Sequence, residues 1–246
     1  MLSEDRKTAV ITGAAGAIGG AIAQLLVEGG WEVVGLDLRK GDSSSIAWVV
    51  ADVTDSEQME TAAKSLDRCD LLVNAAGFGD RAPAAEMTPA QWESVISGCL
   101  SGTFYSCRAF FPQLAAGGGV IVNIASAAAT NALATHANYC SAKAGVVALT
   151  EVLALEWAKE GIRVLAVSPG FVATHKQKLG FETAPKLLGG IEAGTPMGRL
   201  AEVAEIAEAV VGLVGSQFSY LAGTNVVIDG GFSTDGGRSQ LFAAYE

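Results

Sequence analysis

A glycine-rich turn near the start of the chain separates an apolar, β-branched segment from an amphipathic one. Residues 7–12 have the composition of a buried strand, and the residues after the turn predict a helix that stops at a Gly-Gly pair. Gly13, Gly16 and Gly19 follow one another at three-residue intervals. Glycines there allow the backbone to approach a pyrophosphate, and the helix N-terminus adds amide donors and a favourable dipole. In a chain with 30 glycines the spacing alone is weak, so the strand–turn–helix context carries the prediction of a dinucleotide site.

The rest of the chain repeats this alternation of strand and helix. Further short apolar runs predict strands, and the long segment 88–115 predicts either two helices or a kinked one because Gly98 and Gly102 interrupt it. Neither a repeat nor a linker divides the chain. The sequence therefore predicts a single α/β domain over residues 1–246, a doubly wound Rossmann fold whose parallel sheet of about seven strands has helices on both faces. The further predicted strands are 31–37, 46–50, 70–74, 120–124, 162–170 and 224–231, and the other predicted helices are 56–66, 138–160 and 201–214.

Composition narrows the class of protein. With 246 residues and 50% hydrophobic side chains, the chain can bury a substantial core. A formal net charge of −10 argues against nucleic acid as a partner, because phosphate binding needs a basic face. No apolar run approaches the roughly 20 residues of a membrane span, and the N-terminus lacks a signal-like core, so we expect a cytoplasmic protein. Four cysteines without a Cys-x-x-Cys pair and only 2 histidines give no reason to expect a metal site.

The stretch after the predicted strand 120–124 carries the chemistry. Ser126 follows the carboxyl end of that strand, where open α/β sheets hold their ligands. Tyr139 comes thirteen residues later, and Lys143 lies four residues further on, which places the phenol and the ammonium on one helix face. A phenol, with an ordinary pKa of about 10, is a poor base at neutral pH, and a nearby ammonium stabilises its ionised form. A core tyrosine beside a snorkelling lysine is the alternative, but the serine and the nucleotide turn favour an acid/base site.

The end of the second predicted strand bears on cofactor choice. Asp37, 18 residues after Gly19, can accept hydrogen bonds from the ribose hydroxyls of the adenosine and would repel a 2′-phosphate. Arg39 is the opposing signal, because an arginine there can accommodate that phosphate. We therefore expect NAD, with NADP as the less favoured cofactor. The third predicted strand leads to Asp52 and Val53, which are expected beside the adenine.

The long segment 174–200, called the lid segment below, is expected to cover the substrate. Insertions of this length are usually lids or disordered loops. It carries His175 and several lysines, which could meet an anionic substrate or simply face solvent. His136, three residues before Tyr139, and Phe171 are further candidates for substrate contact, with a water-facing loop histidine as the alternative for His136.

Taken together and in this order, these motifs resemble those of the classical short-chain dehydrogenase/reductase family over about residues 7–231. The resemblance implies that Ser126 orients the substrate oxygen, that Tyr139 is the acid/base, and that Lys143 binds the nicotinamide ribose. It also implies a homotetramer built on two long helices. The cofactor-binding positions that it implies are Gly13, Ala15, Gly16, Ile18, Gly19, Asp37, Asp52, Val53, Asn74, Ala75, Ala76, Gly77, Tyr139, Lys143, Pro169, Gly170, Val172 and Thr174.

One position departs from the family pattern. Cys99 stands where the family usually has an asparagine that holds a proton-relay water. A thiol is a weak donor and acceptor, so the relay is either rebuilt by Ser97, Ser101 or the backbone, or slowed. A small residue for helix packing is the simplest interpretation of Cys99, and no evident base supports a nucleophile.

The resulting hypothesis is an NAD-dependent oxidoreductase that interconverts a secondary alcohol and a ketone, with a small-molecule substrate and neither nucleic acid nor membrane as partner. Two alternatives stay open. One is a 3-oxoacyl thioester reductase of the acyl-carrier-protein type that uses NADPH, which the lysines of the lid segment could serve. The other is a catalytically weak nucleotide-binding regulator, with Cys99 as the mark of lost turnover.

Overall fold

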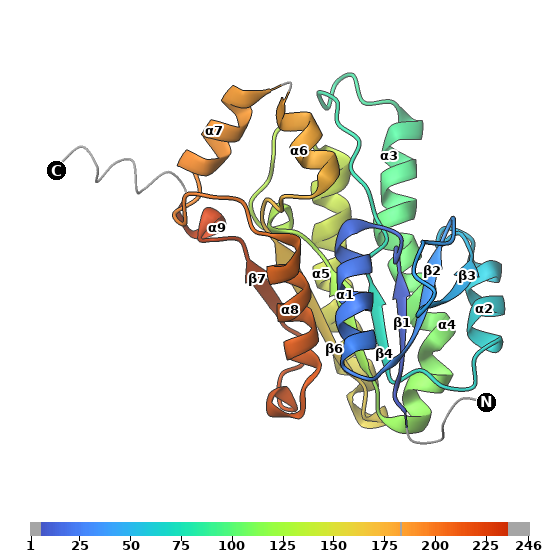
Figure 1. Ribbon diagram of the computed structural model, residues 1–246. Coiled ribbons are helices and arrows are strands. Elements are labelled where there is room, and N and C mark those ends of the chain that lie inside the picture. The colour runs from blue at the N-terminus through green and yellow to red at the C-terminus, as the bar shows by residue number, and fades with distance from the viewer. Residues whose placement is uncertain (1–5, 183, 236–246) are drawn as a thin grey trace.

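The fold is a parallel seven-stranded sheet covered by helices on both faces (Figure 1). We describe residues 6–182 and 184–235 of a computed structural model. The strand order is β3-β2-β1-β4-β5-β6-β7, so the chain reverses direction across the sheet between β1 and β4, as the predicted doubly wound fold requires. The strands are β1 (Thr8–Thr12), β2 (Glu32–Asp37), β3 (Ala47–Val50), β4 (Leu71–Asn74), β5 (Val120–Ile124), β6 (Arg163–Pro169) and β7 (Asn225–Ile228).

Two layers of helices enclose this sheet. Helices α1 and α8 pack beside each other on one face, and α2, α4 and α5 cover the other. The helices are α1 (Ala17–Glu28), α2 (Ser56–Lys64), α3 (Pro89–Ile96), α4 (Gly102–Gly117), α5 (Ala137–Trp157), α6 (His175–Glu182), α7 (Pro185–Ala193), α8 (Val203–Val214) and α9 (Phe232–Asp235). Short 3₁₀ turns occupy Ala127–Ala129, Ala158–Glu160 and Ser216–Phe218. Within the described ranges, no helix is both long enough and apolar enough to cross a membrane.

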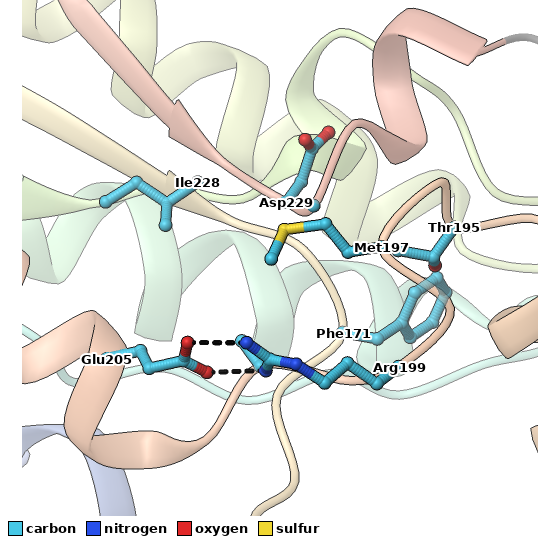
Figure 2. Close-up of a pocket in the computed structure, with 9 residues that line it drawn as sticks. Phe171, Thr195, Met197, Arg199, Glu205, Ile228 and Asp229 are labelled. Carbon is cyan, nitrogen blue, oxygen red and sulfur yellow. Dashed lines mark hydrogen bonds and ion pairs between the residues drawn. The ribbon is translucent and has the colours of Figure 1, made fainter.

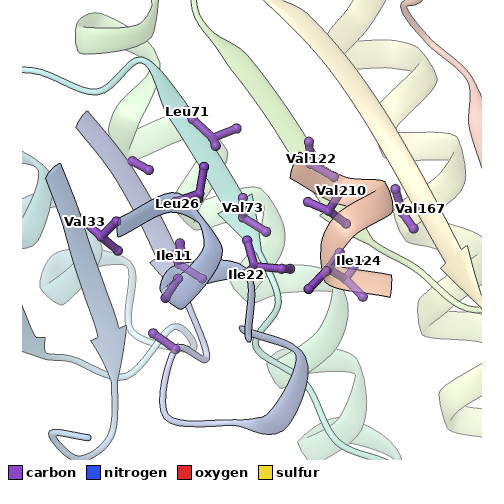
Figure 3. Close-up of a cluster of buried hydrophobic side chains, with 14 of the residues drawn as sticks. Ile11, Ile22, Leu26, Val33, Leu71, Val73, Val122, Ile124, Val167 and Val210 are labelled. Atoms are coloured by element: carbon purple, nitrogen blue, oxygen red, sulfur yellow. The ribbon is translucent and has the colours of Figure 1, made fainter. Parts of the chain in front are cut away.

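Alternate residues of each strand supply the two cores. In β1, Ile11 packs toward α1 and α8, whereas Val10 packs toward α2 and α4. Figure 3 shows the first core, where Ile22 and Leu26 of α1 and Val210 of α8 lie against strand residues such as Val122. All four of these side chains are almost fully buried. Burial on both faces explains why the strands are continuous apolar runs rather than alternating ones.

The long helical segment predicted over 88–115 is a continuous run with a change of pitch. Thr88 caps α3 through a capping box with Gln91, and Pro89 is its first residue. A π-helical turn, Ser97–Ser101, joins α3 to α4 where the sequence is interrupted by glycine. The segment therefore forms one continuous helical run rather than two separate helices.

The lid segment lies above the carboxyl edge of the sheet, where Figure 1 shows α6 and α7. Val172 and Ala201 form an isolated bridge at its base: Ala201 N donates to Phe171 O and Ala173 N donates to Ala201 O. An ion pair between Lys178 of α6 and Glu202, the N-cap of α8, adds a second connection. The segment thus leaves and rejoins the fold at one point, above the ends of β6 and β7.

Candidate active site

The glycine turn after β1 is built by close backbone contacts. Gly13 has φ 68°, and a Cβ atom at this position would lie 2.7 Å from both N and Cα of Ala76. A Cβ on Gly19 would lie 2.3 Å from Gly13 O. Thr12 Oγ1 accepts a hydrogen bond from Ala76 N, which joins the turn to the residues after β4. Glycine at positions 13 and 19 is therefore required by the turn itself.

The N-terminus of α1 fits an anionic group. Gly16, its N-cap, has no side chain with which to cap the helix, and the first turn carries no acidic residue. Helices α2 and α3, in contrast, have their first amides capped by Asp55 and Thr88. Exposed amides at this end of α1 match the phosphates of a dinucleotide.

Asp37 lies at the end of β2 beside this turn. Its Oδ2 accepts a hydrogen bond from Ala15 N at 3.0 Å, which holds the carboxylate against the glycine turn. Arg39 is exposed two residues further along. Asp52 accepts bonds from the backbone and hydroxyl of Thr54, and Val53 packs where a Cβ on Gly102 would stand. Val53 therefore lies against the start of α4, and Asp52 directly precedes it in the chain.

The side chain of Asn74 is directed into the core. It is buried there, and its Nδ2 donates to Asn123 Oδ1 at 2.8 Å. Asn123 in turn donates to Thr150 of α5, so a polar chain links β4, β5 and α5. The Asn74 side chain thus ties the strands together, and only its backbone remains at the carboxyl edge with Ala75, Ala76 and Gly77. In the sequence, the feature that could have indicated this network was the polar Asn123 within an otherwise apolar strand.

Ser126 follows the carboxyl end of β5, and Lys143, which lies beside Tyr139 on α5, contacts the end of the same strand. Ser126 caps the 3₁₀ turn after β5, and its Oγ accepts a bond from Ala128 N at 3.1 Å. Lys143 is 5% exposed, and its Nζ donates to Ile124 O at 2.7 Å. This ammonium lies 5.8 Å from the centre of the Tyr139 ring. The predicted neighbourhood of phenol and ammonium on one face of α5 is present.

Next to Tyr139, the site is bounded by the β4–α3 loop, residues 75–88, and by the π-helical turn. A Cβ on Gly79 would lie 3.7 Å from Tyr139 Cδ2, so the loop passes over the ring. Cys99 is fully buried, packs with Tyr139 in one apolar cluster, and donates from Sγ to Phe78 O at 3.3 Å. Its own carbonyl accepts a bond from Thr103 Oγ1. The thiol therefore ties the loop to the helix, a contact that sequence reasoning did not foresee.

The segment before Tyr139 is held in a defined shape. Asn138, fully buried, donates to Gln91 O and accepts from Tyr139 N, which fixes the start of α5 against α3. Thr135 has φ 66°, an unfavourable conformation for a β-branched residue, and its carbonyl accepts a bond from Ala82 N. His136 bonds through Nδ1 to Ala134 O, so its ring is directed at its own loop.

The residues after β6 form the remaining side. A Cβ on Gly170 would lie 2.7 Å from Asp229 Cβ, so Pro169-Gly170 packs tightly against the end of β7. Phe171 meets Phe232 edge to face at 5.2 Å, and Val172 is buried. His175, at the start of α6, is exposed.

Behind this loop lies a small pocket. Figure 2 shows Phe171 and Met197 there, with Arg199 and Glu205 facing each other through two contacts of 2.7 and 2.8 Å. Because its one basic side chain is already bonded to Glu205, the pocket offers no unpaired cation to a ligand. Across residues 6–182 and 184–235, no group of three or more histidine, cysteine, aspartate or glutamate side chains could hold a metal ion.

We compared the chain with protein families and with known proteins. A family model described as enoyl-(acyl carrier protein) reductase matches residues 13–233. The chain is 39% identical to a D-threitol dehydrogenase of Mycolicibacterium smegmatis, covering 93% of this chain and 94% of that one. It is 35% identical to an NAD-dependent glycerol dehydrogenase of Listeria innocua, covering 92% and 94%.

The fold also matches solved structures. The ligand-free aldohexose dehydrogenase of Thermoplasma acidophilum superposes with a TM-score of 0.88 at 27% identity, covering 93% of this chain and 94% of the other. Sequence, motif order and fold agree over nearly the whole length. The chain is therefore an oxidoreductase acting on CH–OH groups and belongs to the classical short-chain dehydrogenase/reductase family.

Proposed function

We propose that this chain is an NAD-dependent dehydrogenase that interconverts a secondary alcohol of the polyol class and the corresponding ketone, working as a homotetramer. The observation that carries the proposal is the buried Lys143 ammonium, fixed by Ile124 O at 2.7 Å beside the Tyr139 ring at the carboxyl edge of the sheet. Among the residues that the structure describes, no carboxylate pairs with this ammonium, and such a buried charge stabilises a nearby negative charge, which is what an ionised phenol acting as a base requires.

The three side chains then have separate tasks. Ser126 Oγ accepts from Ala128 N, so its hydroxyl hydrogen stays available to donate to the substrate oxygen. Tyr139 removes the hydroxyl proton as the carbinol carbon loses hydride, and returns it in the reverse direction. Lys143 uses one of its three N–H groups on Ile124 O, which leaves two for the nicotinamide ribose. Bound NAD supplies the hydride acceptor, while the protein supplies position and charge.

Asp37 supports the preference for NAD. Its carboxylate is fixed by Ala15 N at the glycine turn, where the adenosine ribose of a dinucleotide bound at α1 would lie. A negative charge in that place accepts bonds from both ribose hydroxyls and repels a 2′-phosphate. The exposed Arg39 is the residue that would have to approach for NADP to bind.

The polyol class comes from the relatives, whose names include D-threitol and glycerol dehydrogenases. The acyl thioester alternative is supported by the description of the matching family model and by Arg39. The two hypotheses differ in cofactor as well as substrate, which makes them easy to separate.

The test is the appearance of reduced nicotinamide with NAD and with NADP across threitol, glycerol, a hexitol, a cyclic alcohol and a hydroxy acid. We expect turnover of the polyols with NAD, and we expect Tyr139→Phe to lower kcat about 10²-fold or more while NAD affinity is nearly unchanged. Full activity of Tyr139→Phe would remove the acid/base assignment. Reduction of a 3-oxoacyl thioester with NADPH would favour the second hypothesis, and NAD binding without any turnover would favour a nucleotide-binding regulator.

A further inference from the structure

The β4–α3 loop passes the ring of Tyr139 at a glycine. A Cβ atom on Gly79 would lie 3.7 Å from Cδ2 and 3.9 Å from Cγ of this ring, and Gly79 itself is exposed. These are ordinary van der Waals distances, so a methyl group would fit at this position. Gly79 therefore borders both solvent and the ring of the tyrosine to which we assign the proton transfer.

Neighbouring glycines are explained by packing, but Gly79 is not. A Cβ on Gly77 would lie 3.1 Å from Cys99 Sγ, and one on Gly98 would lie 2.8 Å from Cε1 of Phe78, so neither position has room for a side chain. Gly79 is not among the glycines with positive φ, and its Cβ would meet no described atom closer than the tyrosine ring. Because an alanine that fits the folded state restricts the unfolded chain more than glycine does, the missing side chain has no local structural benefit.

The loop is fixed on both sides of Gly79. Phe78 O accepts a bond from Cys99 Sγ at 3.3 Å, which ties the loop to the π-helical turn. Ala82 N donates to Thr135 O at 3.0 Å, which ties it to the residues before α5. These two bonds resist a movement of the loop away from the tyrosine. A larger side chain at position 79 would therefore extend over the tyrosine ring or into the space beside it.

We infer that Gly79 is a specificity-determining residue: without a side chain, it leaves the space beside the Tyr139 ring open to the part of the substrate beyond the reacting carbon. This inference rests on the proposed polyol dehydrogenase function and deepens it. In glycerol the secondary alcohol has a single carbon on each side, whereas in a hexitol that reacts at C2 most of the chain lies on one side. Since a ligand site encloses most of its ligand, the longer chain needs room beside the ring, and Gly79 provides it.

The test measures kcat/KM for glycerol, threitol and a hexitol, using NAD, in wild type and in three variants. Gly79→Val places a branched side chain next to the ring, and Gly79→Ala adds only the methyl group that fits there. Ala84→Val, at an exposed position of the same loop, is the matched control. We expect the ratio of kcat/KM for the hexitol over glycerol to fall about tenfold or more in Gly79→Val, and by a smaller factor in Gly79→Ala. Ala84→Val should retain the wild-type ratio.

Each contrary outcome has a distinct meaning. If Gly79→Val lowers kcat/KM for all of these polyols by the same factor, the new side chain only displaces Tyr139, and the inference is overturned. An unchanged ratio in both Gly79 variants, or wild-type turnover of glycerol but not of the longer polyols, overturns it as well and leaves the polyol function intact. Should Gly79→Val not fold, an unchanged ratio in Gly79→Ala is sufficient to overturn it. If wild-type protein oxidises none of the polyols with either cofactor, the proposed function itself fails and takes this inference with it.

Discussion

Cys99, which stands where the family usually has an asparagine, lies in a π-helical turn. The π-helical turn Ser97–Ser101 forms around it, and the thiol makes a bond to Phe78 O that an asparagine amide could also make. The position therefore joins the loop over Tyr139 to the helix, whatever its part in moving protons. Cys99 is therefore a positioning residue, and the effect of replacing it on kcat can be predicted.

We expect Cys99→Asn to keep or raise kcat, because the amide restores a donor to Phe78 O and adds a stronger group for a relay water. Cys99→Ala should lower kcat, since it removes the bond that holds the loop over the Tyr139 ring. Steady-state kinetics of both variants with NAD check the prediction, with Cys99→Ser as the control that keeps a donor. A large loss in Cys99→Asn would show that the thiol has a task of its own.

Thr135 carries backbone strain close to the catalytic tyrosine. Its φ of 66° is the single positive value among non-glycine residues of the described ranges, and its side chain is exposed. A left-handed conformation costs an L-residue about 1–2 kcal/mol. Thr135→Gly should therefore raise the free energy of unfolding by about 1 kcal/mol.

The measurement is urea unfolding at one fixed protein concentration, since assembly shifts the apparent stability. Thr130→Gly is the matched control: Thr130 has φ −114°, which threonine adopts without strain, so glycine there should lower the unfolding free energy by about 0.5–1 kcal/mol. Equal losses in the two variants would show that the Thr135 conformation costs nothing.

At the scale of secondary-structure elements, an ion pair between Arg199 and Glu205 stabilises the start of α8. The Arg199 guanidinium and the Glu202 N–H bond to Glu205 and hold the pKa of that carboxyl at about 2, below its ordinary 4.5. A depressed folded-state pKa means that the contribution to stability is complete above the unfolded-state pKa and is lost as pH falls toward the folded-state value.

The destabilisation caused by Glu205→Gln should therefore be largest at pH 5 and above and shrink between about pH 4.5 and about 2. Urea midpoints of the variant and wild type across this range give the difference directly, and added salt should reduce it because the pair is partly exposed. Glu208→Gln, exposed on the same helix, should show no such pattern. A pH-independent difference would mean that Glu205 acts by packing.

At the same scale, sequence periodicity predicted the strands and main helices, because runs such as Thr8–Thr12 are buried on both faces. It could not give the direction of the Asn74 side chain, since a strand apolar on both faces shows no alternation from which to read an orientation. Helices α6 and α7 were missed because glycine and polar residues interrupt any apolar stripe in the lid segment.

At the scale of the whole molecule, α4 and α5 present apolar side chains to the outside. Phe111 and Trp157 join the two helices through a ring contact of 4.9 Å, and beyond them Leu155 is 82% exposed and Val152 48% exposed. Phe104 of α4 is also exposed. Scattered apolar residues are ordinary on a surface, but a group on two adjacent helices is less so, and we propose that it is a contact region. These are the helices on which the proposed homotetramer would be built.

Leu155→Glu should break that assembly. In a two-fold interface the same residue occurs on both copies, so each contact would bring two carboxylates into an apolar region. Burying these charges is unfavourable because neither has a cationic partner. Light scattering coupled to size exclusion should give a smaller species than wild type, with unchanged far-ultraviolet circular dichroism. Val50→Glu, an equally non-conservative change at an exposed position of the edge strand β3, is the control that should leave the mass unaltered. If Leu155→Glu keeps the wild-type mass, the α4–α5 face is not where the copies meet, and the edge strand β7, with Val227 exposed, becomes the next surface to change.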